Sequence, residues 1–202
     1  IEWTNFDDVV EMIVAIINSK VHGKPHLVGL SLGGSLILKL LEKHSSLIDR
    51  VIVDGASPQS IKGYRKIIAI VYLMSFLKNT KFVANLLTKM MQEDGAPVQD
   101  VQHFVADFQS AERRSFRRAM SQANLLRLNL QFDNPAFFVS GGKEAETIHD
   151  WHRRLADKNA RSECAYYPGN GHAWLFSDVD THIQLLRYFF QNASFPEKLK
   201  RF

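Results

Sequence analysis

Apolar residues recur in the first part of the chain with the spacing of a helix and then form an unbroken run. Six apolar side chains between residues 5 and 19 share one side of a helical period, and acidic residues occupy its first turns. They are Phe6, Val9, Val10, Ile13, Ile16 and Ile17. Gly23 and Pro25 end this pattern, and residues 26–30 form a short apolar run typical of a buried parallel strand. The opening segment therefore predicts a helix followed by a strand.

The same alternation continues along the chain, with one interruption. Residues 32–44 return to helical spacing, and residues 50–54 form the next apolar run. Residues 61–128 then contain three or four helical stretches and no convincing strand. Strand and helix patterns alternate again at residues 135–140, 145–158, 163–167 and 178–191.

This rhythm is typical of an α/β fold with a mostly parallel sheet flanked by helices. The interruption indicates a helical insertion rather than a separate domain that follows the sheet. We therefore expect residues 1–59 and 128–202 to form one core and residues 60–127 to form a helical cap or lid.

One short motif carries candidate chemistry. Gly29 to Gly33 fits G-x-S-x-G around Ser31, with the apolar strand before it and the amphipathic helix after it that this motif requires. Such a serine sits on a sharp strand-to-helix turn, so Gly29 and Gly33 are expected to allow close backbone approach. Gly34 would add close helix packing. The Leu32 N–H lies at the start of the helix, where partial positive charge stabilises an oxyanion.

A serine nucleophile needs a base, and the base needs an orienting group. His172 stands in a Gly-rich segment directly after the last predicted core strand, and Glu144 stands in the loop after the preceding strand. Loops at the carboxyl ends of parallel strands are where such sheets hold their sites. We therefore expect Ser31, Glu144 and His172 to meet at one edge of the sheet.

These features together resemble the α/β-hydrolase fold superfamily, particularly its serine carboxylesterase-like and lipase-like members with a helical cap. The order serine, acid, histidine is the chain order of that superfamily. The resemblance extends over nearly the whole chain. It rests on Gly29-Leu30-Ser31-Leu32-Gly33-Gly34, Asp54-Gly55, Gly141-Gly142-Lys143-Glu144 and Gly171-His172 before an amphipathic final helix.

The resemblance assigns roles to these positions. It implies Ser31 as nucleophile, His172 as base and Leu32 N–H as one oxyanion donor. Most relatives carry Asp where Glu144 stands, and other branches place the acid after the strand that here ends in Asp54. We expect Glu144 to be the acid and keep Asp54 as the alternative.

The superfamily also has four further strands before the nucleophile strand, and the loop after one of them gives the second oxyanion donor. No such strands precede residue 26. We therefore expect a sheet without its N-terminal part, and a strand at 26–30 that forms an exposed edge. The sequence is interpreted as a piece of a longer protein.

Composition and short motifs argue against several other classes of protein. The apolar stretch at 67–77 is too short to span a membrane, and the single cysteine, Cys164, makes no internal disulfide, so we expect a cytoplasmic protein without stable membrane insertion. No dinucleotide or P-loop pattern occurs, and no nucleic-acid-binding signature is present. We predict no organic cofactor and no nucleic-acid partner.

Positive charge is concentrated in the middle of the chain. Residues 60–131 hold 11 Lys or Arg and 5 Asp or Glu. Such a segment can face an acidic ligand or a membrane surface, but Arg113, Arg114, Arg117 and Arg118 recur at helical spacing. We favour a solvated helix face.

Two other groups of residues have an ordinary explanation. His149 and His152, with Glu146 and Asp150, offer metal donors at helical spacing, but no second cluster completes a zinc site, so we expect a surface helix and no metal. The apolar residues of the insertion mostly pack together, and a minority face an acyl group. They are Ile67, Ile68, Val71, Met74, Phe76, Phe82, Leu86, Leu87, Met90 and Met91.

The sequence thus predicts a serine hydrolase that cleaves a small or medium apolar carboxylic ester or thioester through an acyl-enzyme on Ser31. Its partner would be a small acyl substrate. Two alternatives stay open: a non-catalytic or slow-turnover ligand-sensing protein on the same fold, and an inactive fragment of a hydrolase.

Overall fold

The sheet is the centre of the molecule. The computed structural model describes residues 2–60 and 62–202. Four parallel strands lie side by side in chain order, and a fifth short strand is antiparallel to the fourth. They are β1 (Leu27–Leu30), β2 (Val51–Asp54), β3 (Ala136–Gly141), β4 (Glu163–Tyr167) and β5 (Lys200–Arg201). The mostly parallel sheet is confirmed, whereas β5 was not predicted because two residues carry no pattern.

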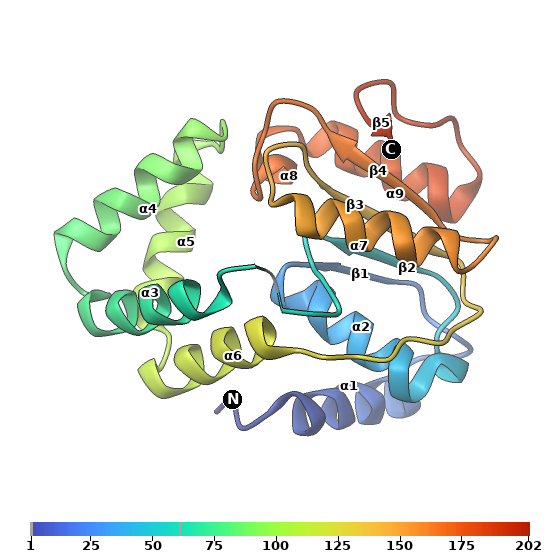
Figure 1. Ribbon diagram of the computed structural model, residues 1–202, viewed down its shortest axis with the longest axis horizontal. Helices are drawn as coiled ribbons and strands as arrows, with labels where there is room; N and C mark the ends of the chain where they lie inside the picture. Colours follow the sequence, from blue (N-terminus) through green and yellow to red (C-terminus); the bar gives the residue numbers. More distant parts are fainter. Residues whose placement is uncertain (1, 61) are drawn as a thin grey trace.

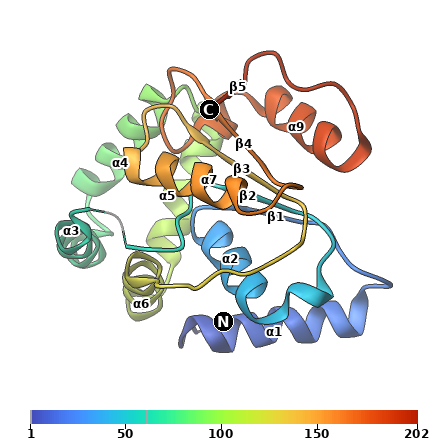
Figure 2. The same ribbon diagram turned by 45° about the vertical axis from the view of Figure 1, so that its right-hand side comes forward.

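Helices cover both faces of this sheet (Figure 1, Figure 2). One face packs against α2 (Leu32–His44) and α7 (Glu146–Asp157), with α1 (Phe6–Lys20) against α2. The other face packs against α8 (Trp174–Ser177) and α9 (Val179–Gln191).

Alternation of side chains within the buried strands explains the two layers. Val53 and Phe138 belong to the cluster on the α2 side, whereas Ile52 and Phe137 belong to the cluster on the α9 side. Successive residues of a strand point to opposite faces, so a continuous apolar run fills both layers. A single turn of helix, η1 (Ser45–Leu47), leads from α2 to β2.

Four helices lie between β2 and β3 in the chain and stand beside the sheet rather than on its faces (Figure 1). They are α3 (Tyr64–Leu77), α4 (Lys81–Glu93), α5 (Val98–Ser110) and α6 (Arg113–Leu125). Helix α3 packs mainly on α6, and α4 packs mainly on α5. We call α3 to α6 the helical insertion.

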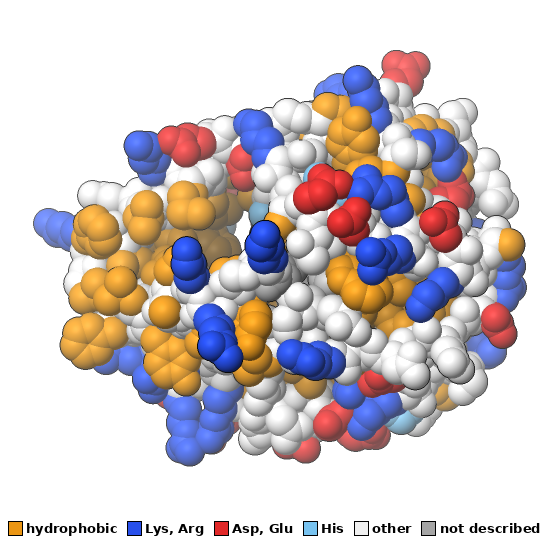
Figure 3. Space-filling model, viewed as in Figure 1, with side chains coloured by type: hydrophobic (Ala, Val, Ile, Leu, Met, Phe, Trp, Pro, Cys, Tyr) orange, Lys and Arg blue, Asp and Glu red, His pale blue; other side chains and the backbone are white. Residues whose placement is uncertain are grey.

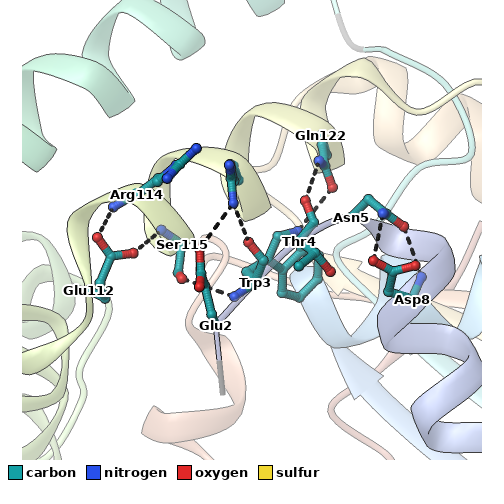
Figure 4. Close-up of polar contacts among 10 residues, drawn as sticks. Glu2, Trp3, Thr4, Asn5, Asp8, Glu112, Arg114, Ser115 and Gln122 are labelled. Atoms are coloured by element: carbon teal, nitrogen blue, oxygen red, sulfur yellow. Dashed lines mark hydrogen bonds and ion pairs between the residues drawn. The ribbon is translucent and has the colours of Figure 1, made fainter.

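The segment before α1 joins the core to the helical insertion (Figure 4). The backbone N–H of Trp3 donates to Ser115 Oγ (2.9 Å), and its indole N–H donates to Gln122 Oε1 (2.9 Å). Arg118 on the same helix reaches Glu2 Oε1 at 3.3 Å. These bonds fix α6 against the N-terminal segment.

The arginines of α6 divide into two pairs. Arg113 and Arg114 are exposed, as predicted for a solvated face. Arg117 and Arg118 are half-buried, because Arg117 lies over the Tyr72 ring (5.4 Å to its centroid) and Arg118 bonds the segment at Glu2. The prediction of one solvated face is therefore wrong for the second pair. Among the described helices, none combines the length and apolar character that crossing a bilayer requires.

Candidate active site

Ser31 occupies a strained turn between β1 and α2. Its φ of 55° and ψ of −112° lie in a region that side-chain-bearing residues rarely adopt. Its backbone N–H donates to the carbonyl oxygen of Asp54 (2.8 Å), at the end of the neighbouring strand, and its carbonyl accepts from Ser35 N–H (2.9 Å). Strand β2 and helix α2 thus hold the turn from both sides.

Close backbone packing at this turn requires glycine at two of the three predicted positions. A Cβ atom on Gly29 would lie 2.5 Å from the carbonyl carbon and oxygen of Gly33, and one on Gly34 would lie 2.8 Å from the Ala56 side chain. A Cβ on Gly33 would meet nothing within 4 Å. The prediction that position 33 requires glycine is therefore wrong. The close contact is between the backbone of Gly33 and the position of a Cβ atom on Gly29, so of these two residues only Gly29 must lack a side chain.

His172 and Glu144 form a hydrogen-bonded pair at the same sheet edge. His172 Nδ1 lies 3.0 Å from Glu144 Oε2, and the other carboxylate oxygen of Glu144 accepts from Gly141 N–H (3.2 Å). The Glu144 side chain is 6% exposed, whereas that of His172 is 47% exposed. The carboxylate is thus held inside while one side of the imidazole reaches the surface.

The two loops that carry this pair pack backbone against backbone. Lys143 N–H donates to the Asn170 carbonyl (2.9 Å), and Gly142 N–H donates to the Tyr167 carbonyl (2.8 Å). A Cβ on Gly141 would overlap the carbonyl of Gly171. These contacts fix the loop after β3 against the loop after β4.

The negative groups around His172 favour its protonated form. Burial lowers the pKa of His172, but the hydrogen bond and charge of Glu144, with the charge of Asp94, outweigh burial and raise the pKa above the ordinary histidine value. The imidazole is therefore a stronger base than a free histidine.

Asp54, the alternative acid, lies behind this pair. It is fully buried, its Oδ1 accepts from the Trp174 indole N–H (3.2 Å), and its Oδ2 has no hydrogen-bond partner among the described residues. Burial, with the charge of Glu144, raises the pKa of Asp54 to about 8, against the lowering effect of the Trp174 bond. The bond to His172 comes from Glu144 and not from Asp54.

Gly55 separates Asp54 from the pair. It adopts a positive φ of 58°, and a Cβ there would lie 2.7 Å from His172 Cε1 and 3.0 Å from Glu144 Oε1. The chain after β2 therefore passes directly against the imidazole. Ser31 bonds the backbone of Asp54, and the next residue, Gly55, lies against His172. The turn of Ser31 and the His172–Glu144 pair therefore lie at the same edge of the sheet.

Two polar groups at the turn have unused bonding capacity. The Leu32 N–H donates no hydrogen bond within residues 2–60 and 62–202, as expected for the first turn of a helix. In the same described ranges, the Ser31 hydroxyl makes no hydrogen bond, including none to His172. Both groups are thus free to meet a ligand.

The helical insertion contributes a residue that the sequence did not single out. Asp94, which follows α4, accepts from Gly171 N–H through Oδ1 (3.0 Å), and its carbonyl accepts from the Asn170 side chain (2.9 Å). Asn170 also donates to Ser177 Oγ (2.7 Å). The loop that carries His172 is therefore tied to the insertion on one side and to α8 on the other.

His149 and His152 were expected on a surface helix, and that expectation is wrong. Both lie on the buried face of α7, at 6% and 0% exposure. His149 Nε2 pairs with the Gly141 carbonyl (3.1 Å), and His152 Nε2 pairs with the Ala56 carbonyl (3.0 Å). Burial lowers the pKa of His152 to about 4, so this ring is neutral at pH 7. In the described part of the chain, no three His, Cys, Asp or Glu side chains converge as a metal site.

The geometry agrees with the comparison of the sequence with known families. The profile described as the alpha/beta hydrolase family matches residues 1–181. The chain belongs to the alpha/beta hydrolase family. This membership supports a hydrolase in general and names no substrate.

Solved structures share the α/β-hydrolase fold of this chain. MenH from S. aureus superposes with a TM-score of 0.75 at 15% identity, over 93% of this chain and 76% of that one. An enol-lactonase from Burkholderia xenovorans gives 0.76 at 13% identity, over 93% and 74%. A thermophilic esterase from Thermogutta terrifontis gives 0.74 at 14% identity, over 95% and 74%. No curated protein matches the chain significantly. Identities this low establish the hydrolase fold alone.

Proposed function

We propose that this α/β-hydrolase is a serine hydrolase that cleaves a small or medium apolar carboxylic ester or thioester. The observation that carries the proposal is the 3.0 Å contact between His172 and Glu144 at the sheet edge where the strained turn presents Ser31. A histidine oriented by a buried carboxylate, close to a serine on a strained strand-to-helix turn, is the arrangement that activates serine.

The first half-reaction transfers the acyl group to Ser31. With Nδ1 bonded to Glu144, Nε2 of His172 accepts the proton of Ser31 Oγ as Oγ attacks the acyl carbon. The carbonyl oxygen becomes an oxyanion that the Leu32 N–H stabilises. The carbon–oxygen or carbon–sulfur bond then breaks, and His172 returns its proton to the leaving alkoxide or thiolate.

The second half-reaction releases the acid. His172 accepts a proton from water, the resulting hydroxide attacks the acyl carbon, and Ser31 leaves as its hydroxyl after taking the proton back. Glu144 stays ionised throughout and stabilises the imidazolium in both steps. Glu144, rather than Asp54, takes this role because it makes the bond to Nδ1.

Hydrophobic side chains of the helical insertion support the proposal that the acyl group of the substrate is apolar. Figure 3 shows a hollow lined by hydrophobic side chains between α4 and the core. Met90 is 55% exposed one turn before Asp94, which binds the loop that carries His172. Val71 and Met91 are buried, so these two residues pack within the insertion instead. In this proposal the insertion acts as the cap over the site.

One observation favours the second candidate function, a ligand-sensing protein with slow or no turnover. The Ser31 hydroxyl makes no hydrogen bond to His172 among the described residues. A family member that keeps the pocket but never brings Ser31 and His172 into hydrogen-bond contact would bind an acyl compound without hydrolysing it.

Hydrolysis of a series of p-nitrophenyl esters separates the two candidates. We expect turnover of acetate, butyrate and octanoate esters to fall by roughly 10³-fold or more in Ser31→Ala and in His172→Ala. The exposed Ser46→Ala and His22→Ala are matched controls and should retain full activity. Full activity in Ser31→Ala would reject the serine mechanism, and saturable ester binding without product would favour the sensor.

A further inference from the structure

Helix α3 and the start of α4 present large apolar side chains to solvent. Ile70, Leu73 and Phe76 on α3 are 54%, 58% and 71% exposed, and Phe82 on α4 is 70% exposed. Figure 3 shows hydrophobic side chains gathered over these two helices, with Lys and Arg among them. We call these four residues the α3 surface. Contiguous exposed apolar groups of this kind mark interaction sites.

All charged residues in the segment that carries the α3 surface are positively charged. Between Asp54 and Glu93 the sequence contains six Lys or Arg and no Asp or Glu. Lys78 is buried and donates to the carbonyls of Gln109 and Ala111. The other five, all exposed, are Lys62, Arg65, Lys66, Lys81 and Lys89. Lys89 forms an ion pair with Glu93 (3.7 Å).

Two other exposed apolar residues lie on helices that also carry acidic residues. Ile16 is 57% exposed on α1, which carries Asp7, Asp8 and Glu11. Val179 is 50% exposed on α9, beside Asp180. Of these three segments, only α3 and the start of α4 combine exposed apolar groups with several positive charges and no acidic residue.

We propose that the α3 surface docks on an anionic lipid bilayer. A helix with Lys and Arg beside Phe and Leu lies in the headgroup region, where apolar side chains enter the acyl boundary and cations meet lipid phosphates. The charge favours lipid over a second copy of this chain, because two-fold pairing would bring the cations of two such segments together. Helix α3 has 14 residues, so this is peripheral docking and not a span.

Flotation of the chain with vesicles tests the proposal. We expect binding to vesicles of equal parts phosphatidylglycerol and phosphatidylcholine, much weaker binding to phosphatidylcholine alone, and loss of binding at high salt. The double variants Leu73→Ser/Phe76→Ser and Arg65→Glu/Lys66→Glu should each bind at least about tenfold more weakly. Matched controls are Val179→Ser for apolarity and Lys20→Glu/Lys158→Glu for charge, and both should bind as the parent does.

Tryptophan fluorescence tests which part of the protein surface contacts the bilayer. Tryptophan emission of Phe76→Trp should shift to shorter wavelength when anionic vesicles are added, whereas Val179→Trp should show no shift. Absence of binding by the folded chain, checked by circular dichroism, would overturn the proposal. An equal loss of vesicle binding in the control variants would also overturn it. A dimer in sedimentation velocity that only the α3-surface variants abolish would overturn it as well. That last result would assign the surface to a second copy.

Discussion

Glu144 Oε2 lies 3.0 Å from His172 Nδ1, while Glu144 Oε1 accepts the Gly141 N–H. The Glu144 carboxylate therefore bonds both to the His172 imidazole and to the backbone of Gly141 at the end of β3. The bond to His172 occupies Nδ1, so Nε2 is the ring nitrogen that would accept the serine proton in the proposed mechanism.

The first prediction concerns the identity of the acid. Glu144→Gln should lower kcat by roughly 10²–10⁴-fold, because an amide does not stabilise the imidazolium and permits the wrong tautomer. The exposed Glu197→Gln should leave kcat unchanged. Asp54→Asn should cost far less than Glu144→Gln in the same ester assay. The reverse order of effects would transfer the role to Asp54.

The second prediction concerns pH. His172 must be neutral to accept a proton, so kcat/KM should rise with pH through the pKa of His172, which lies above the ordinary histidine value. Glu144→Gln removes the main stabilising charge and should move this rise to lower pH. Asp54, with a pKa of about 8, is mostly protonated below that pH, so Asp54→Asn should move the rise little. A large shift in Asp54→Asn would show that its carboxyl is ionised near neutral pH.

The third prediction compares two glycines of one motif. Gly29→Ala should lower the free energy of unfolding by about 3 kcal/mol or more, because its Cβ would overlap the Gly33 backbone. Gly33→Ala meets open space in a helix and should leave stability unchanged or raise it by up to about 1 kcal/mol. Urea denaturation measures both. Equal destabilisation would contradict the packing described for this turn.

The fourth prediction concerns the link between the helical insertion and His172. Asp94→Ala should lower kcat/KM by roughly tenfold to a hundredfold, because Gly171 loses the acceptor that positions its loop. Asp94→Asn keeps an acceptor oxygen but loses the charge, so it should retain most activity and shift the pH rise downward. The neighbouring exposed Glu93→Gln is the control. Unchanged activity and pH profile in Asp94→Ala would remove Asp94 from any positioning role.

Local patterns predicted most of the fold. The strands and helices of the core appear where apolar periodicity placed them, since a buried parallel strand and an amphipathic helix differ in period over a few residues. The order of Ser31, Glu144 and His172 also predicted that three strand ends would share one edge, because parallel strands point the same way.

Long-range contacts explain what the sequence did not reveal. Asp94 and Gly171 are 77 positions apart, so no local pattern joins them. His149 and His152 looked like surface residues, but backbone carbonyls of Gly141 and Ala56 satisfy their rings inside the core. A polar side chain on a buried helix face is read correctly only when its partner is known.

Intact-mass spectrometry after treatment with a fluorophosphonate tests the central claim most directly, because it reports an activated serine without knowledge of the substrate. The account predicts one adduct on the folded parent chain, none on Ser31→Ala, and strongly slowed labelling of His172→Ala. Labelling of Ser31→Ala at the parent rate, or no adduct on the folded parent, would contradict it.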